Sequence, residues 1–311
     1  MDTCVKKLPQ NTKAYFIKLG VGGGWEEPCL ANGTLRFGYR DTPHGQCLNG
    51  EWEKVHELWT KVRGGNVTTA SNDTRQIKTF YEADENAIFI TFFKGCLWWC
   101  HPKGAPKIHV SQDGTRVRKT VDGWKNASLG GELLSVSRLS GKLTKTQMYR
   151  GTICDVKEKA YLLRRINDEK TPELAAVEET EKTFLVQILA MIRLLDPRDF
   201  ELMVELIFSN SGWQRQSWTG GSQRTIDVDL RLPSTGETAF VQVKSETDDD
   251  QFDEYANYLA GTDAHARMFY VWHSGAIDRK PPSNITLWGP DVIASKVLEA
   301  GLLRWLKDRV A

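Results

Sequence analysis

Short apolar runs with the alternating pattern of strands fill the first half of this chain, between residues 14 and 154. Glycines and Asn or Asp turns separate these runs, which are rich in β-branched and aromatic residues. The predicted strands are residues 15–19, 34–39, 87–93, 97–101 and 107–110. Trp52, Val55, His56 and Trp59 recur at helical spacing and predict one helix over 50–63. We therefore expect a small β-rich α+β barrel.

The second half alternates between helical and strand patterns. Apolar periodicity predicts helices over 178–195 and 199–208, interrupted at Asp196-Pro197. Strands over 225–232 and 239–244, joined by a turn at 234–237, form a predicted hairpin. A helix (252–259), a strand (267–273) and a closing helix (291–308) complete an α/β core. The polar segment 167–181 separates the two patterns, so we predict two domains, 1–165 and 166–311.

Length and composition agree with two globular domains. The chain has 311 residues, more than one hydrophobic core usually organises, and 40% of them are hydrophobic and 26% charged. No apolar stretch reaches the length of a membrane span, and the first 18 residues lack the apolar run of a signal peptide. We expect a cytoplasmic protein that makes no use of a membrane.

The six cysteines are too few to indicate a disulfide framework in such a protein, so we expect free thiols. Cys96 and Cys100, with His101 beside them, could indicate zinc, but no second pair at metal-ligand spacing follows. Residues 97–99 have the character of a strand, which would place both cysteines on one face. The interpretation that we favour is structural: both cysteines belong to the core.

The net charge of +1 is the sum of a basic first half and an acidic second half. Residues 1–165 contain 26 lysines and arginines against 16 aspartates and glutamates, a net of +10, and the remainder carries −9. A basic first half attracts phosphates without regard to sequence, which indicates a polyanionic partner. A basic surface without such a partner is the alternative.

Four polar residues of the predicted hairpin can carry chemistry. Asp227 and Asp229 share one face of the first strand, and Gln242 and Lys244 share one face of the second. Phosphodiester hydrolysis needs a hard cation held by oxygen ligands, an activated water, and positive charge near the developing phosphorane. Carboxylate, amide oxygen and ammonium meet these needs. A solvated, salt-bridged hairpin face is the alternative interpretation of the same residues.

The motifs around this hairpin resemble the restriction-endonuclease-like PD-(D/E)XK superfamily, in particular its Mrr-type branch, in which glutamine replaces the central acid. The resemblance covers roughly residues 196–275. It rests on Phe200-Glu201-Leu202, Gly212-Trp213, Gly220-Gly221, Ile226-Asp227-Val228-Asp229 and Val241-Gln242-Val243-Lys244-Ser245. The fold that it implies is an α/β domain with a mixed central sheet.

The same resemblance implies a role for each site residue. One of Asp227 and Asp229 binds Mg²⁺ (or Mn²⁺), and Ile226-Asp227 fits the family pattern better, although Thr225 stands where the family has glycine. Gln242 contributes an oxygen ligand, and Lys244 orients or activates the water. Glu201 approaches the same metal from the preceding helix, with Glu205 as the alternative acid.

The first half resembles the PUA/EVE-like readers of modified bases, through weaker motifs spread over roughly residues 14–155. They are Gly24-Trp25, Gly38-Tyr39, residues 87–93 and 97–100, Trp124, Leu139 and Thr146-Gln147. Such modules hold a flipped base between aromatic and polar groups. The resemblance makes Trp25, Tyr39, Trp98 and Trp99 the candidate base-binding residues. Ordinary core packing is the alternative for each of these rings.

Together these features predict a modification-dependent or anti-phage restriction endonuclease that acts on double-stranded DNA, including base-modified DNA. A repair or mobile-element nuclease without base recognition is one alternative. A catalytically inactive nucleic-acid-binding protein is another. Because cutting both strands needs two active centres, we expect a homodimer.

Overall fold

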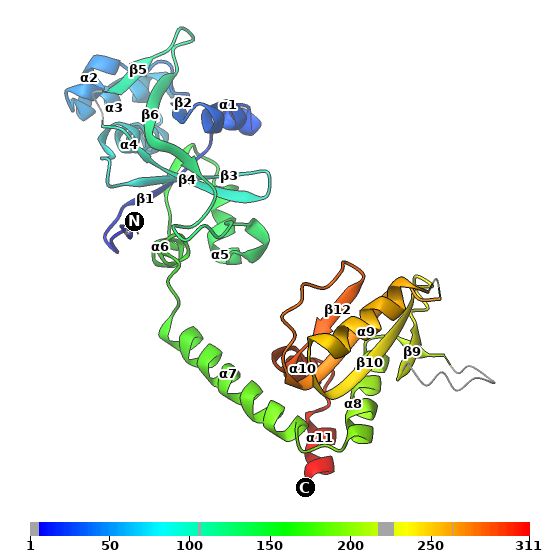
Figure 1. Ribbon diagram of the computed structural model, residues 1–311. Helices are drawn as coiled ribbons and strands as arrows, with labels where there is room; N and C mark the ends of the chain where they lie inside the picture. Colours follow the sequence, from blue (N-terminus) through cyan, green and yellow to red (C-terminus); the bar gives the residue numbers. More distant parts are fainter. Residues whose placement is uncertain (1–5, 105–106, 217–226, 263) are drawn as a thin grey trace. The chain divides into compact units, whose positions relative to one another are not determined.

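The computed structural model describes residues 6–104, 107–216, 227–262 and 264–311, which form two compact units. Unit 1 is Met1–Lys170 and unit 2 is Thr171–Ala311, so the division falls inside the polar segment 167–181. Each unit has one sheet with parallel and antiparallel pairs (Figure 1). The mixed α/β class predicted from the sequence is confirmed. Over the described ranges, no helix combines the length and the apolar character that crossing a membrane requires.

Unit 1 contains a curled sheet of seven strands. The order is β2 (Thr34–Phe37), β6 (Arg116–Lys125), β4 (Cys96–Pro102), β3 (Ile88–Phe93), β1 (Ala14–Ile17) and β7 (Ile153–Asp155), and β5 (Ile108–Val110) also pairs with β6. β1 is parallel to β3, and the other pairs are antiparallel. The five strands predicted for this half all appear, whereas β6 and β7 were not predicted.

The central strand β3 shows why the apolar run over 87–93 is continuous. Phe89 points into one core cluster, and Ile88, Ile90 and Phe92 point into another on the opposite face. Both faces of the strand are therefore covered. A strand that is buried on two sides has no polar face to alternate with its apolar one.

Six α-helices are described in unit 1: α1 (Glu26–Ala31), α2 (His44–Leu48), α3 (Trp52–Val62), α4 (Val67–Glu82), α5 (Gly141–Thr144) and α6 (Lys159–Asn167). The predicted helix over 50–63 is confirmed as α3, which buries Val55 and Trp59. α2, α3 and α4 pack together beside the sheet (Figure 1). α4 was not predicted, because its buried face includes Asp73, Thr74 and Gln76 and so lacks a clear apolar period.

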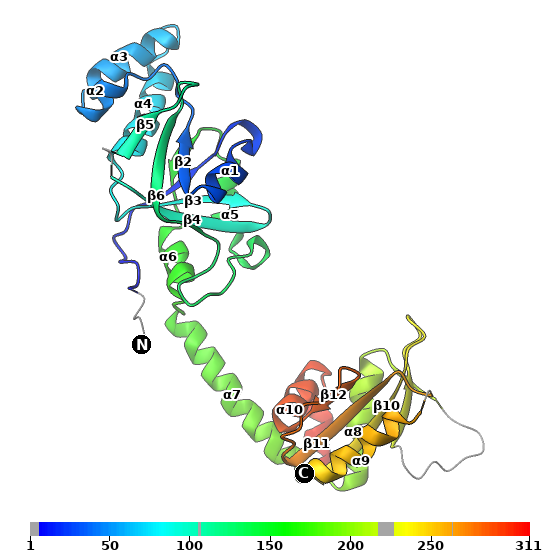
Figure 2. The same cartoon turned by 45° about the horizontal axis from the view of Figure 1, so that its top comes forward.

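Unit 2 is a five-stranded sheet with helices on both faces. The strand order is β12 (Ile285–Trp288), β11 (Arg267–Gly275), β10 (Thr238–Thr247), β9 (Val228–Arg231) and β8 (Gln214–Arg215). α9 (Asp249–Ala260) covers one face, and α8 (Pro197–Asn210) and α10 (Pro290–Glu299) cover the other (Figure 2). The predicted hairpin is present as β9 and β10, although residues 225 and 226 of its first strand lie outside the described residues.

Two of the predicted helices differ most from the structure. α7 (Pro172–Ile192) begins before residue 178, because the Thr171 side chain accepts a hydrogen bond from the Leu174 amide and Pro172 occupies the first turn. The single closing helix predicted over 291–308 is wrong. It is divided into α10 and α11 (Leu303–Val310) at Gly301, whose φ of 70° lies in the left-handed region.

Candidate functional site

The hairpin of β9 and β10 brings the predicted site residues together in unit 2. Val228 pairs with Val241 and Asp229 pairs with Phe240, so Asp227, one residue before β9, comes level with Gln242. Val241 and Val243 pack into the core beneath α8. Strand alternation therefore places Gln242 and Lys244 on the opposite face, the one that α9 covers.

Asp227 is fixed against β10 by two hydrogen bonds. Its Oδ2 accepts one from Gln242 Nε2 at 2.5 Å and one from the backbone amide of Val243 at 2.7 Å. Burial raises the pKa of this carboxyl, although both hydrogen bonds and the charge of Lys244 act in the opposite direction. The carboxylate is thus partly withdrawn from water, and the two hydrogen bonds and the charge of Lys244 offset only part of the cost of its burial.

Gln242 presents an oxygen that no protein group uses. The side chain is 2% exposed, and its Oε1 is buried without a hydrogen-bond partner in the described part of the chain. A buried acceptor in this state costs about 1–3 kcal/mol, a cost that a ligand at the oxygen would remove. A carbonamide oxygen is a suitable ligand for Mg²⁺, so this atom fits a metal site.

Glu201 lies on α8, which covers the other face of the sheet, and the charges of Asp227 and Lys244 both act on its carboxyl group. Asp196 caps that helix by accepting hydrogen bonds from the amides of Arg198 and Asp199, and the neighbouring Phe200 is buried. Burial raises the pKa of Glu201, and the negative charge of Asp227 raises it further. Because two carboxylates repel each other here, a cation between them would be stabilised by both. The alternative acid, Glu205, is instead paired with Arg215 at 2.7 Å.

Lys244 is held by an aromatic residue that the sequence did not single out. Its Nζ lies 5.1 Å from the centre of the Tyr255 ring on α9. Burial alone would lower the pKa of Lys244, but the contact with Tyr255 and the charge of Asp227 outweigh it, and the pKa is raised. The side chain is therefore an ammonium at neutral pH. It can orient a water or phosphate oxygen and stabilise negative charge, but it cannot accept a proton.

Asp229 has a different partner. Its Oδ1 lies 3.1 Å from Nε2 of His265, which is nearly buried and stands edge-on to the Phe240 ring. The structure therefore separates the two aspartates, with Asp227 beside Gln242 and Asp229 beside His265. Sequence reasoning missed His265 because it follows α9, far from the hairpin in the chain.

The donor set for a metal is small. In ranges 6–104, 107–216, 227–262 and 264–311, no group of three or more His, Cys, Asp or Glu side chains is arranged to hold a metal ion. Asp227 and Glu201 supply two carboxylates, and Gln242 supplies an amide oxygen. Mg²⁺ commonly takes one or two carboxylates and completes its shell with water and substrate phosphate. The set suits Mg²⁺ better than a metal that needs an all-protein cage.

Gly220-Gly221 and Ile226 of the predicted motif lie outside the described residues.

The candidate zinc residues Cys96 and Cys100 lie on β4, with Cys100 buried in the core of unit 1. Burial raises the pKa of the Cys100 thiol well above its usual range, which disfavours the thiolate that zinc requires. All five described cysteines, from Cys29 to Cys154, are free, and Cys4 lies outside the described residues.

The candidate base-binding aromatics are largely packed inside unit 1. Trp99 is 1% exposed and donates a hydrogen bond from Nε1 to the Ala127 carbonyl, so it belongs to the core and cannot stack on a base. Trp98 packs on the other core cluster and donates to the Phe93 carbonyl.

Tyr39 and Trp25 are also engaged within unit 1. Tyr39 stacks on Phe37 at 4.6 Å and donates its hydroxyl to Asp73. The guanidinium of Arg36 lies 4.6 Å from the centre of the Trp25 ring. These rings are therefore held by protein contacts, which supports the core-packing alternative for them.

Comparison with known proteins gives no match: no family model, no curated protein and no solved structure matches this chain. Its function is therefore inferred from its own residues.

Proposed function

We propose that this chain is a Mg²⁺-dependent (or Mn²⁺-dependent) DNA endonuclease whose active centre lies in unit 2. The observation that carries the proposal is the contact of Asp227 with Gln242, whose Oε1 stays buried and without a partner in the described structure. A merely solvated hairpin would place these groups in water, where an amide oxygen is satisfied. Here the oxygen is withdrawn from water on the same side chain that donates to Asp227, and an amide oxygen is a ligand that Mg²⁺ accepts.

Each residue has a stated task in this proposal. Asp227, Glu201 and the Gln242 oxygen hold the metal. When bound, the metal supplies positive charge that polarises the phosphoryl group and acidifies the attacking water. The Lys244 ammonium, kept protonated by its surroundings, orients that water and stabilises the negative charge that develops on the phosphate oxygens.

Unit 1 is proposed to bind the DNA duplex and to select modified bases. The support is charge: the +10 of residues 1–165 attracts phosphates, whereas the −9 of the remainder repels them. This division makes the chain a candidate modification-dependent or anti-phage restriction enzyme with a restriction-endonuclease-like unit 2 and a PUA/EVE-like unit 1. Because each chain holds one proposed centre, cutting both strands of a duplex calls for a homodimer.

Plasmid cleavage tests the nuclease activity. We expect the full-length protein to nick or linearise plasmid DNA with MgCl₂ or MnCl₂ and to leave the plasmid uncut with EDTA. Glu201→Gln should lose activity, and Glu254→Gln, which changes an exposed carboxylate on α9, should keep it. Equal cleavage by the two variants, or cleavage in EDTA, would contradict the proposed centre. No cleavage by any form, with DNA binding intact, would indicate the inactive binding protein.

A second comparison tests base selection. Matched plasmids with and without base modification should be cut at different rates if unit 1 is a reader. Equal rates would instead indicate a repair or mobile-element nuclease, in which unit 1 only grips the DNA.

A further inference from the structure

The proposed metal centre lies in the half of the chain whose net charge repels DNA. Residues 166–311 carry −9, and each phosphate of the substrate is negative. Salt screens exposed charges beyond about 10 Å, so a distant basic surface does not offset this repulsion at the centre. A DNA strand that reaches the centre therefore needs positive side chains of unit 2 beside it.

The corner between α7 and α8 lies at the end of the sheet to which Lys244 belongs. β10 and β11 are parallel, and Trp272 is level with Lys244, so His273 follows directly towards the carboxyl ends of both strands. The ring of Phe200, on α8, lies 4.7 Å from the ring of His273. Arg193, at the end of α7, donates from Nε to the His273 carbonyl at 3.1 Å. In open α/β sheets, ligands bind outside the carboxyl ends of the strands.

Arg198 lies beside Glu201 on this corner. It stands in the first turn of α8, three residues before Glu201, and side chains at this spacing are neighbours on a helix surface. Burial raises the pKa of Glu201, and the charge of Arg198 is among those that act in the opposite direction. The Arg198 charge is therefore close enough to act on a proposed metal ligand.

The guanidinium of Arg198 has no internal partner. Across residues 6–104, 107–216, 227–262 and 264–311, no hydrogen bond or ion pair engages it. The neighbouring carboxylates have other partners, because Asp196 caps α8 and Asp199 pairs with Arg309 at 3.3 Å. The helix dipole also opposes a cation in the first turn. The chain thus keeps an exposed charge at a place where it adds no stability.

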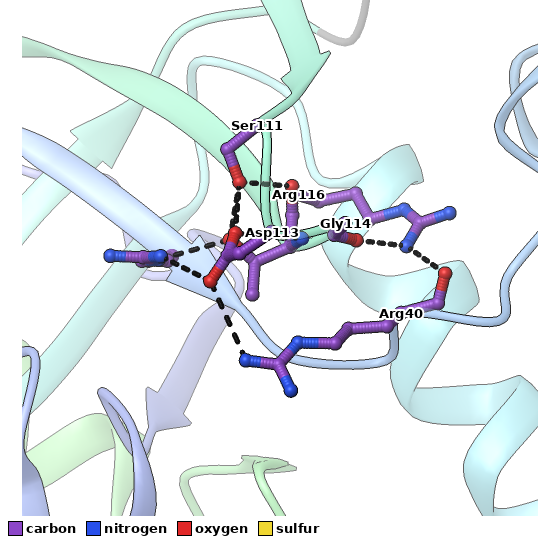
Figure 3. A network of polar contacts seen from close by, with 7 residues as sticks. Arg40, Ser111, Asp113, Gly114 and Arg116 are labelled. Carbon is purple, nitrogen blue, oxygen red and sulfur yellow. Dashed lines mark hydrogen bonds and ion pairs between the residues drawn. The ribbon is translucent and has the colours of Figure 1, made fainter.

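Arginines of unit 1 show the contrasting case, in which a nearby acceptor is used. Arg36 and Arg40 contact Asp113 at 2.6 and 3.5 Å, and Arg116 donates to the carbonyl of Arg40 (Figure 3). These contacts join β2, the loop that follows it and the turn between β5 and β6. Arg198 makes no contact of this kind, which leaves it available to a ligand.

Arg193 provides a second guanidinium on the same corner. The His273 carbonyl occupies its Nε, whereas no described residue occupies either of its Nη groups. The side chain is exposed. A guanidinium can bind two phosphate oxygens with parallel N–H donors, and one that is already held at Nε loses little further freedom on binding.

We propose that Arg193 and Arg198 bind two backbone phosphates of the DNA strand, on either side of the phosphate at the metal centre. The proposal rests on the nuclease proposed for unit 2, and it supplies the positive groups that the negative charge of this unit makes necessary. The two arginines position the strand, while Lys244 acts at the phosphate that is cut.

Salt dependence of DNA binding tests the contacts without cleavage. The full-length protein binds a fluorescent duplex in EDTA, and anisotropy gives the affinity at several NaCl concentrations. Arg193→Ala and Arg198→Ala should each reduce the slope of log affinity against log salt by about 0.9, and the double variant by about twice as much. Arg198→Lys keeps the charge and should keep the slope.

Arg231→Ala is the matched control. Arg231 is an exposed arginine of unit 2 that lies level with Thr238 at the start of β10. That position is about 20 Å along the strand from Lys244. Its removal changes the net charge by the same amount and should leave the slope unchanged.

Cleavage kinetics in MgCl₂ give a second measurement. Arg198→Ala should raise KM by about tenfold and change kcat little, because a contact with a flanking phosphate binds substrate and transition state equally. Arg198→Lys should recover only part of this loss, since an ammonium cannot bind two oxygens in parallel. The Tm of the free protein should not fall in Arg198→Ala. A lower Tm would show a structural role and contradict the proposal.

The outcomes separate these contacts from the nuclease itself. Wild-type slope and KM in both alanine variants would overturn the arginine contacts and leave the nuclease proposal standing. An equal reduction of the slope by Arg231→Ala would also overturn them, because net charge alone would then explain it. Reduced slopes in a protein that cuts no plasmid would support the contacts and overturn only the nuclease.

Discussion

The carboxylate of Asp227 accepts a hydrogen bond from the side-chain amide of Gln242 at 2.5 Å, whereas Asp229, two residues further on, lies 3.1 Å from His265. The two aspartates therefore have different neighbours, although the strand pattern places both on the same face. If the proposed centre is correct, they must also differ in their effect on activity.

Asp227→Asn should abolish cleavage, and Asp229→Asn should reduce it much less, because Asp227 shares its surroundings with Gln242 and the charge of Glu201, whereas Asp229 contacts His265. Thermal unfolding gives an independent measurement. MgCl₂ should raise the Tm of the wild type and of Asp229→Asn but not that of Asp227→Asn, since a ligand stabilises only a state that binds it. Equal, small effects of both substitutions would point to a solvated hairpin.

Lys244→Ala should lower the cleavage rate by about two to three orders of magnitude, the usual cost of removing an electrostatic catalyst. The side chain is only partly buried, so circular dichroism and the Tm should change little. Lys280→Ala removes an exposed lysine of the same unit and serves as the control. Wild-type activity in the purified Lys244→Ala protein would rule out the assigned role.

Tyr255→Phe keeps the ring over which Lys244 lies but removes the hydroxyl that bonds to it. We expect a loss of about tenfold in cleavage rate, the equivalent of one hydrogen bond to a charged group. Because that bond helps to raise the pKa of Lys244, the alkaline limb of the pH–rate profile should move to lower pH. A lower rate with an unmoved alkaline limb would indicate only a structural role for the hydroxyl.

The raised pKa values of Asp227 and Glu201 predict a pH dependence of stability with a definite sign. A carboxyl whose folded-state pKa exceeds its unfolded value contributes stability that is fully present below the unfolded pKa and is lost as pH rises through the folded pKa. In EDTA at neutral pH, Asp227→Asn should therefore raise the Tm, by roughly a few degrees. Calorimetry against the exposed-site control Asp250→Asn checks this, and a fall in Tm would show that ionised Asp227 stabilises the apoprotein.

The charge division predicts how the two units share DNA binding. Residues 1–170 expressed alone should bind duplex DNA, with log affinity falling against log salt by about 0.9 for each phosphate neutralised. Residues 171–311 should bind poorly. If base contacts contribute, the preference for modified DNA should persist at high salt, because such contacts release few counterions. Tight binding by the acidic fragment alone would reverse the proposed roles.

Local pattern was enough to predict the elements whose apolar spacing is strongest. The strands over 87–93 and 97–101 and the helix over 50–63 were predicted because their apolar spacing is strong and their ends carry turn residues. α4 was not predicted because it buries the polar residues Asp73 and Gln76. Asp73 accepts hydrogen bonds from Arg63 and Tyr39, and Gln76 accepts them from the amides of Thr152 and Ile153. Only contacts distant in the chain make those positions suitable for burial.

For the candidate site, the sequence by itself determined the chemistry that is available: carboxylates, an amide and an ammonium at spacing two on adjacent strands, and a basic first half. Only the tertiary structure decided which groups meet. It placed Asp227 beside Gln242, Asp229 beside His265 and Tyr255 beside Lys244. The physical reason is that strand periodicity sets the face on which a side chain lies, whereas its partner depends on the register between strands and on the helix packed above them.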